Sequence, residues 1–214
     1  MIGHGFLRPG TIAVATLGLA AALIAGCGQN GGTPSAATAP TVVKAHPYKI
    51  ESDLPNALAF FGNTNVFEGT VDSVLPNVHA VDVLDTGETI EAVYTPVTIT
   101  IDTVYRGKLK AGSEVTIRSM GGEAGGISYV IHEAPAKETF QPGSRVVIFG
   151  GELARVDSES APAITPNFVY QQVGGEFVDA TYADGPTNGD APSAAAVAEV
   201  RAQLRALPSA PQRD

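Results

Sequence analysis

Cysteine is nearly absent from this sequence: Cys27 is the only one among 214 residues, so no disulfide can form within the chain. A domain without disulfides has to be stabilised by its hydrophobic core, and a hydrophobic content of 44% makes such a core possible. Basic residues are also few, since 13 Lys and Arg stand against 22 Asp and Glu. Because nucleic acids and anionic lipid headgroups are bound through basic patches, we expect neither as a partner.

The sequence also lacks a hydrophobic run long enough to cross a bilayer as a helix, which takes about 20 mostly apolar residues. Its N-terminal apolar segment, 11–25, is shorter and is interrupted by Thr16 and Gly18. One fixed positive charge, Arg8, precedes this segment. A basic start followed by a short apolar segment is typical of a secretory signal peptide, which predicts that the mature protein is exported.

The apolar segment ends in Leu23-Ile24-Ala25-Gly26-Cys27, which resembles the lipobox of bacterial lipoproteins. The resemblance implies cleavage before Cys27, which becomes a lipidated (palmitoylated) N-terminus on the extracytoplasmic face of a bacterial membrane. A single acyl chain binds a bilayer only reversibly, so stable anchoring implies the two or three chains of mature lipoproteins. An ordinary secretory signal is the alternative, but it gives no reason for a cysteine at this position.

The sequence divides into four parts of different composition. Residues 1–26 are the predicted signal peptide, and 27–43 hold the lipidated cysteine and a linker. Residues 44–207 are predicted to form one mostly-β domain with a C-terminal helix, followed by a tail at 208–214. The linker has almost no bulky apolar side chain and cannot bury enough surface to offset the entropy of ordering, so it is expected to be a flexible tether.

Short runs of β-branched and aromatic residues, separated by Gly, Pro and Asp, are typical of strands and turns from Asn65 onward. Apolar and polar residues alternate in four of these runs: 67–72, 97–101, 115–118 and 127–131. The alternation predicts strands with one buried and one solvent-facing side, and it places Glu68 and Arg118 on the solvent-facing side. The apolar phase slips by one residue at Asp102-Thr103, which predicts a β-bulge.

One further strand and one hairpin have clear signals. Residues 146–149 are apolar without alternation, which predicts a strand covered on both faces. Gly174-Gly175 separates two strand-like runs and predicts a two-residue hairpin turn.

Helical spacing occurs twice. Leu54, Leu58 and Phe61 predict a short helix over 53–61. Near the C-terminus, apolar residues recur at helical spacing at 197, 200, 204 and 207. Asp190 or Ser193 is the expected cap of this second helix.

Four segments together resemble the small OB-like barrels of the netrin and tissue-inhibitor-of-metalloprotease type: Val66 to Val71, Ile99 to Gly107, Val115 to Gly122 and Phe140 to Phe149. The resemblance covers roughly 65–178 and implies a small OB-like barrel or sandwich of five to seven strands. Its motifs consist of turn and core residues, so they indicate a fold and no activity. The inhibitors of that type use a free N-terminal cysteine locked by disulfides, and Cys27 departs from that arrangement.

The glycine-rich segment 119–126 is the candidate ligand contact. A loop of this kind can bring backbone amides close to an anion. The alternative is a bulged connection between strands, in which glycine permits tight curvature. The six predicted contact residues are Ser119, Gly121, Gly122, Glu123, Gly125 and Gly126.

Metal and catalytic signals are weak. Asp82, Asp85 and Glu88 surround Thr86-Gly87 and offer the oxygen ligands that calcium prefers. Their spacing differs from that of an EF-hand loop, and it also suits a solvated hairpin turn. The histidines at 46, 79 and 132 lack the spacing of zinc ligands. No cofactor is predicted, and no nucleophile, acid-base pair or triad is visible in the sequence.

These features predict a lipid-anchored binding or structural module of the cell envelope, without an identifiable catalytic activity. Its expected partners are the membrane, through the lipid, and an unidentified envelope protein or small ligand. An inhibitor or accessory subunit of an envelope enzyme is the alternative. A hydrolase whose site residues are brought together only by the fold is a third.

Overall fold

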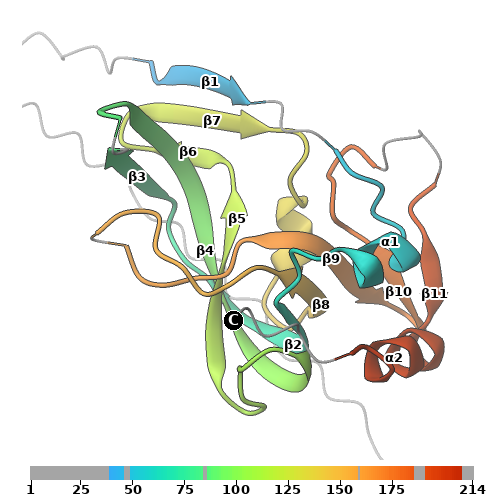
Figure 1. The fold of residues 1–214 in the computed structure, drawn as a ribbon. Helices are drawn as coiled ribbons and strands as arrows, with labels where there is room; N and C mark the ends of the chain where they lie inside the picture. Colours follow the sequence, from blue (N-terminus) through green and yellow to red (C-terminus); the bar gives the residue numbers. More distant parts are fainter. Residues whose placement is uncertain (1–38, 46–48, 84–85, 159, 186–190, 209–214) are drawn as a thin grey trace, which may run out of the picture. The chain divides into compact units, whose positions relative to one another are not determined.

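The computed structural model describes residues 39–45, 49–83, 86–158, 160–185 and 191–208 (Figure 1). The predicted signal peptide, Cys27 and Asp85 lie outside these residues. Within them, eleven strands form two sheets. The three helices are α1 (Leu54–Ala59), the 3-10 helix η1 (Lys137–Phe140) and α2 (Val197–Arg205). None of the described helices has the length and apolar character needed to span a membrane.

The larger sheet has the strand order β11-β10-β9-β8-β2-β4-β3, with β5 also paired to β4. Its strands are β2 (Asn65–Val74), β3 (Val78–Val83), β4 (Thr89–Arg106), β5 (Glu114–Met120), β8 (Arg145–Gly150), β9 (Pro166–Val173), β10 (Glu176–Asp179) and β11 (Ala194–Ala196). In the smaller sheet, β7 (Ile127–Ile131) lies between β6 (Gly122–Ala124) and β1 (Thr41–Ala45), and β1 is parallel to β7. Strand β1 begins inside the segment predicted as linker.

Strand β4 connects several parts of the larger sheet (Figure 1). Its first residues pair with β3, its middle with β5 and its last residues with β2. The predicted bulge is confirmed, because Glu68 pairs with Thr103 and Gly69 with Ile101, which leaves Asp102 without a counterpart.

A segment just before β9 lies beside β5. Ile117 and Ile164 form a parallel bridge, in which the amide of Arg118 donates to the carbonyl of Ile164 at 2.9 Å. The amide of Ile164 donates in turn to the carbonyl of Thr116 at 3.0 Å. This pairing brings the start of β9 next to the side chain of Arg118.

Strand β8 is covered on both faces, as its continuous apolar run predicts. Val146 and Ile148 belong to one hydrophobic cluster, together with residues of β2, β4 and β5. Val147 and Phe149 point the other way, into a second cluster that includes residues of α1 and α2. The two clusters form the core, with β8 between them.

Two solvent-facing predictions are wrong. Glu68 is 1% exposed, because a residue of α2, Arg201, covers that side of β2. Arg118 is 4% exposed, because Ala154 and Thr165 come from later parts of the chain to contact its guanidinium. Alternation correctly separated the faces of each strand, but the polar face is covered at these two residues.

The two predicted helices exist, with corrected ends. Asp53 caps α1 by accepting a hydrogen bond from the amide of Asn56 at 2.9 Å. The helix ends at Ala59, and Phe61, expected on its apolar face, is 85% exposed. Ser193 does not cap α2, because residues 194–196 pair with β10 as β11 before the helix begins; Asp190 lies outside the described residues.

The mostly-β class and the C-terminal helix are confirmed, whereas the expected number of five to seven strands is too low. The short strands β1, β6 and β11 account for much of the excess, and each has only three to five residues. The Gly174-Gly175 turn is confirmed, because Val173 of β9 pairs with Glu176 of β10.

Candidate functional site

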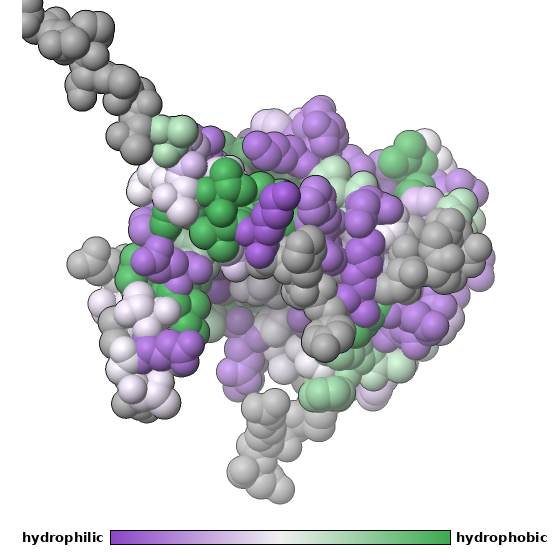
Figure 2. All heavy atoms as spheres, turned by 90° about the horizontal axis from the view of Figure 1, so that it is seen from above, coloured by the Kyte–Doolittle hydropathy of each residue, from purple (hydrophilic) through white to green (hydrophobic). Residues whose placement is uncertain are grey.

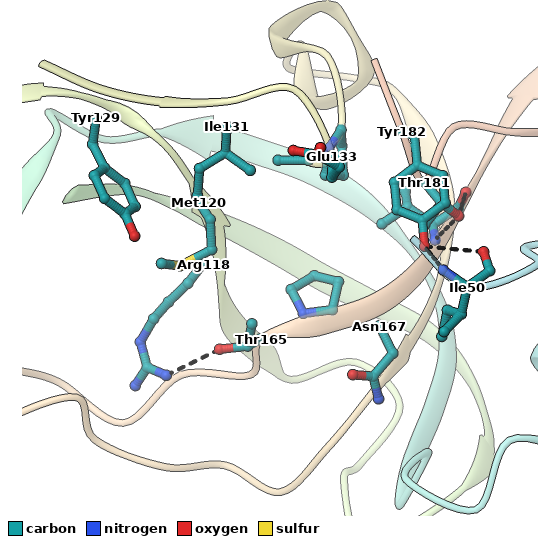
Figure 3. A pocket seen from close by; sticks show the side chains of 14 residues that line it. Ile50, Arg118, Met120, Tyr129, Ile131, Glu133, Thr165, Asn167, Thr181 and Tyr182 are labelled. Carbon is teal, nitrogen blue, oxygen red and sulfur yellow. Dashed lines mark hydrogen bonds between the residues drawn. The ribbon is translucent and has the colours of Figure 1, made fainter. Parts of the chain in front are cut away.

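A cavity of about 580 Å³ is the candidate site (Figure 3). Its wall is formed by strands β5 and β7, the residues after β7, the start of β9, and two segments near α1 and β10. The lining residues are Ile50, Arg118, Met120, Tyr129, Ile131, Glu133, Ala134, Pro135, Thr165, Pro166, Asn167, Val169, Thr181 and Tyr182. A volume in this range suits a small organic ligand.

Figure 2 shows how hydrophobic side chains are distributed on one face of the molecule. Hydrophobic groups on that face are separated by hydrophilic ones (Figure 2). Exposed large hydrophobic residues such as Val42, Val81 and Ile90 belong to different strands. Scattered exposed apolar side chains are ordinary on a protein surface, so the cavity is the better candidate.

Arg118 is the charged group at one end of the cavity. Its Nη1 donates a hydrogen bond to Thr165 Oγ1 at 3.3 Å, and its Nη2 donates to the carbonyl of Ala154. Its Cζ lies 5.7 Å from the centre of the Tyr94 ring, which is a cation–π distance. Figure 3 shows the side chain reaching from β5 toward Thr165.

The Nε of Arg118 is buried and has no hydrogen-bond partner within the described part of the chain. Arg118 also forms no ion pair with another described residue: the basic residues in ion pairs between two described residues are Lys49, His79, Arg145 and Arg201. A guanidinium is always charged, and burying a charge without a counter-ion costs several kcal/mol. The carbonyl of Ala154 and the Tyr94 ring offset part of this cost. This end of the cavity is therefore electrostatically complementary to an anion.

Hydrogen bonds at the other end of the cavity fix Tyr182. Its hydroxyl donates to the carbonyl of Ile50 at 3.1 Å and accepts from the Ile50 amide at 2.9 Å. Burial is the main cause that raises the pKa of Tyr182, so this side chain stays neutral at physiological pH. Glu133 is close enough to Tyr182 for its charge to raise that pKa further.

A buried network next to the cavity supports this end of the wall. Ser52 Oγ donates to Asp179 Oδ2, and the hydroxyl of Tyr170 donates to the carbonyl of Ser52. The other carboxylate oxygen of Asp179 accepts from the amide of Thr181 at 3.0 Å. Burial and the nearby Asp179 charge raise the pKa of Tyr170, which keeps its hydroxyl protonated as a donor. These bonds hold Thr181 and Tyr182 beside the cavity.

A second charged cluster, Glu68 with its partners, lies away from the cavity. Arg201 donates two hydrogen bonds to the Glu68 carboxylate, at 2.9 and 2.6 Å, and Tyr105 donates one at 3.0 Å. Arg145 donates to Glu68 at 2.9 Å and also to Asp102 at 3.1 Å. Because the Glu68 carboxylate already accepts four hydrogen bonds, this cluster fastens α2 to the sheet and does not suggest a ligand site.

The pKa values in this cluster follow from burial and charge. Burial alone raises the pKa of Glu68, but the hydrogen bonds from Arg201 and Tyr105 and the charges of Arg201 and Arg145 outweigh it and lower the pKa below 4.5. Burial, then the charge and hydrogen bond of Glu68, raise the pKa of Tyr105 to about 12. The carboxylate is therefore ionised and the phenol neutral at physiological pH.

The glycine-rich segment predicted as a ligand contact does not line the cavity. Strand β5 ends with Ser119 and Met120. Gly122 and Glu123 belong to β6, and Gly125-Gly126 forms the turn to β7. Of residues 119–126 only Met120, which the prediction left out, contributes to the wall. A ligand contact at the six predicted residues stays a prediction.

Backbone geometry explains two of these glycines. Gly122 and Gly125 have φ values of 127° and 61°, which strain other residues. A Cβ on Gly122 would lie 2.5 Å from the Asn77 side chain, and one on Gly125 would lie 2.5 Å from His79. These contacts favour the alternative interpretation, a tightly curved connection between strands.

The predicted calcium ligands are not brought together in the described residues. Asp82 belongs to β3, Glu88 immediately precedes β4, and Asp85 lies outside the described residues. Across the described ranges, no group of three or more His, Cys, Asp or Glu side chains is arranged to hold a metal.

Sequence reasoning missed Arg118, the central residue of the site. Its position in an alternating strand suggested solvent exposure, and its contact with Thr165 spans 47 positions of sequence. A basic residue among the apolar and hydroxyl side chains of residues 115–120 was the one available signal. The chain has no match to a protein-family model, to a curated protein or to a solved structure.

Proposed function

We propose that this protein is a ligand-binding module of the bacterial cell envelope, anchored through lipid on Cys27 at the extracytoplasmic face of the membrane. The observation that carries the binding function is the cavity with Arg118 in its wall, a guanidinium that has no carboxylate partner among the described residues. Natural proteins leave few buried polar groups without a partner, and those that remain often mark a ligand or catalytic role. The anchoring rests on the resemblance of residues 24–27 to a lipobox.

An OB-like barrel is the architecture that we propose for the domain. Five strands support it: β2, β4 and β5 pair in succession, β8 pairs with β2, and β9 pairs with β8. The parallel bridge between Ile117 and Ile164 joins the start of β9 to β5, which would close the circuit. OB-like barrels bind their ligands through one sheet face and its loops, and Arg118 and Met120 belong to one such strand, β5.

Filling the cavity tests the binding function. Ala134 lines the cavity and is 7% exposed, so Ala134→Phe places a phenyl ring in the ligand space. Ala206→Phe adds the same group at an exposed position after α2 and is the matched control. We expect native mass spectrometry of protein extracted from its own membranes to find a small molecule bound to the wild type and to Ala206→Phe, but not to Ala134→Phe. An unchanged bound mass in Ala134→Phe, or none in the wild type, would contradict the proposal.

A further inference from the structure

We infer that the ligand of the cavity is a singly charged carboxylate with an apolar body, held by Arg118. This inference rests on the proposed binding function and specifies the chemistry of the ligand. It follows from the free donors of Arg118, the charges in the wall and the apolar surface beside them.

Arg118 has donors left for a carboxylate. A guanidinium carries five N–H groups, of which one on Nη1 bonds Thr165 and one on Nη2 bonds Ala154. Two further N–H groups, one on Nη1 and one on Nη2, have no partner among the described residues. The Nε–H also lacks a partner there, but its nitrogen is enclosed by protein atoms. Carboxylates accept two parallel hydrogen bonds from such a fork, and these charge-assisted bonds are among the stronger ones in proteins.

The charges of the wall favour one negative charge over two. Arg118 and Glu133 are the charged residues that line the cavity, and Glu133 lies beyond ion-pair distance from Arg118. One carboxylate would neutralise Arg118 locally. A doubly charged phosphate would leave a second negative charge without a basic partner among the lining residues, which costs free energy.

Most of the remaining wall is apolar. Met120, Tyr129, Ile131 and Val169 lie in the strands around the cavity, and Pro166 begins β9. Figure 3 shows Met120, Tyr129 and Ile131 on the same side of the cavity as Arg118. A ligand of formate size would leave this surface in water, so the carboxylate is expected to carry a hydrocarbon or aromatic body.

Met120 gives a direct probe of the cavity. The chain has two methionines, and the other, Met1, lies in the predicted signal peptide. We would label the methionine methyl groups of the full chain with ¹³C, purify it in detergent micelles, and titrate it with 3-phenylpropionate, 3-phenylpropan-1-ol and inorganic phosphate. We expect 3-phenylpropionate to shift the Met120 signal saturably, and the alcohol and phosphate to bind at least tenfold more weakly.

Two variants test the role of Arg118. Arg118→Met should weaken the binding of 3-phenylpropionate at least tenfold. Arg155→Met, which removes an exposed arginine that donates to the carbonyl of Ser160, should not change the affinity. If Arg118→Met does not fold, Arg118→Lys keeps the charge without the fork, and it should still weaken binding several-fold.

The outcomes separate this inference from the proposed function. If the alcohol binds as tightly as the acid, or Arg118→Met binds the acid like the wild type, the cavity is a ligand site but the carboxylate inference is wrong. If phosphate binds more tightly than the acid, the inference is also wrong. If none of the three probes shifts the Met120 signal, both the inference and the proposed cavity function are overturned.

Discussion

At the residue scale, the chain buries two charges in different ways. The Glu68 carboxylate accepts hydrogen bonds from Tyr105, Arg145 and Arg201 and is fully paired. The guanidinium of Arg118 has no carboxylate partner among the described residues, only a hydroxyl and a carbonyl. Removing a partner from a paired buried charge is destabilising, whereas removing an unpaired buried charge also removes the cost of its desolvation. The two residues should therefore respond differently to substitution.

Glu68→Gln should lower the free energy of unfolding by about 3 kcal/mol at pH 7, because it leaves Arg201 without its carboxylate partner. The pKa of Glu68 is lowered from 4.5, so its ionised form stabilises the fold above that pH, and this stabilisation is lost as the pH falls through the lowered pKa. The difference between wild type and variant should therefore shrink at pH 3. Urea denaturation at both pH values measures it, with Glu199→Gln on the exposed side of α2 as control. An equal difference at both pH values would show that Glu68 does not act through its charge.

Arg118→Met should change the free energy of unfolding of the ligand-free protein by no more than about 1 kcal/mol, because the lost hydrogen bonds are offset by the relief of an unpaired buried charge. The carbonyl of Ala154, an exposed residue, can bond water instead. Urea denaturation of ligand-free protein measures the change. A loss above about 2 kcal/mol would mean that Arg118 is retained for stability rather than for binding.

At the element scale, sequence patterns predicted the individual strands, but they did not predict which other parts of the chain pack over those strands. The continuous apolar run of β8 correctly predicted a strand between two layers, and the phase slip at Asp102 correctly predicted a bulge. Alternation in β2 and β5 correctly separated the two faces of each strand. It could not show that α2 covers Glu68 or that Thr165 covers Arg118, because those contacts depend on distant parts of the chain.

Ile148→Asn should lower the free energy of unfolding by about 4 kcal/mol, because it removes a fully buried side chain and places an amide in an apolar cluster. Ile90→Asn, in the part of β4 that pairs with β3, is the matched control: Ile90 is 47% exposed, and the change should cost less than about 1 kcal/mol. Thermal and urea unfolding of both variants measure the effect. Similar losses would show that β8 is not the central strand described above.

At the scale of the whole molecule, the site depends on pairings that local patterns do not encode. The parallel bridge between Ile117 and Ile164 places the start of β9 beside β5, and β1 pairs in parallel with β7. Such contacts between distant segments are selected by the overall packing, and no turn residue signals them. The mostly-β class and the C-terminal helix were therefore predictable, but the cavity was not.

The anchoring proposal concerns the chain as a whole and is tested by Cys27→Ser. We expect the variant to lose label from a palmitate analogue and to leave the membrane fraction, because Cys27 is the only cysteine available for lipid attachment. Ser35→Ala, in the predicted linker, should remain labelled and membrane-bound. A Cys27→Ser protein that still carries label and sediments with membranes would rule out the lipobox.

The most direct test of the binding function is a crystal structure of the protein isolated from its own cell envelope with its ligand retained. The result that we predict is density in the cavity beside Met120 and Tyr129, with an acceptor oxygen within about 3 Å of an Nη atom of Arg118. Ligand density at another surface, with none in this cavity, would contradict the assignment of this cavity as the binding site.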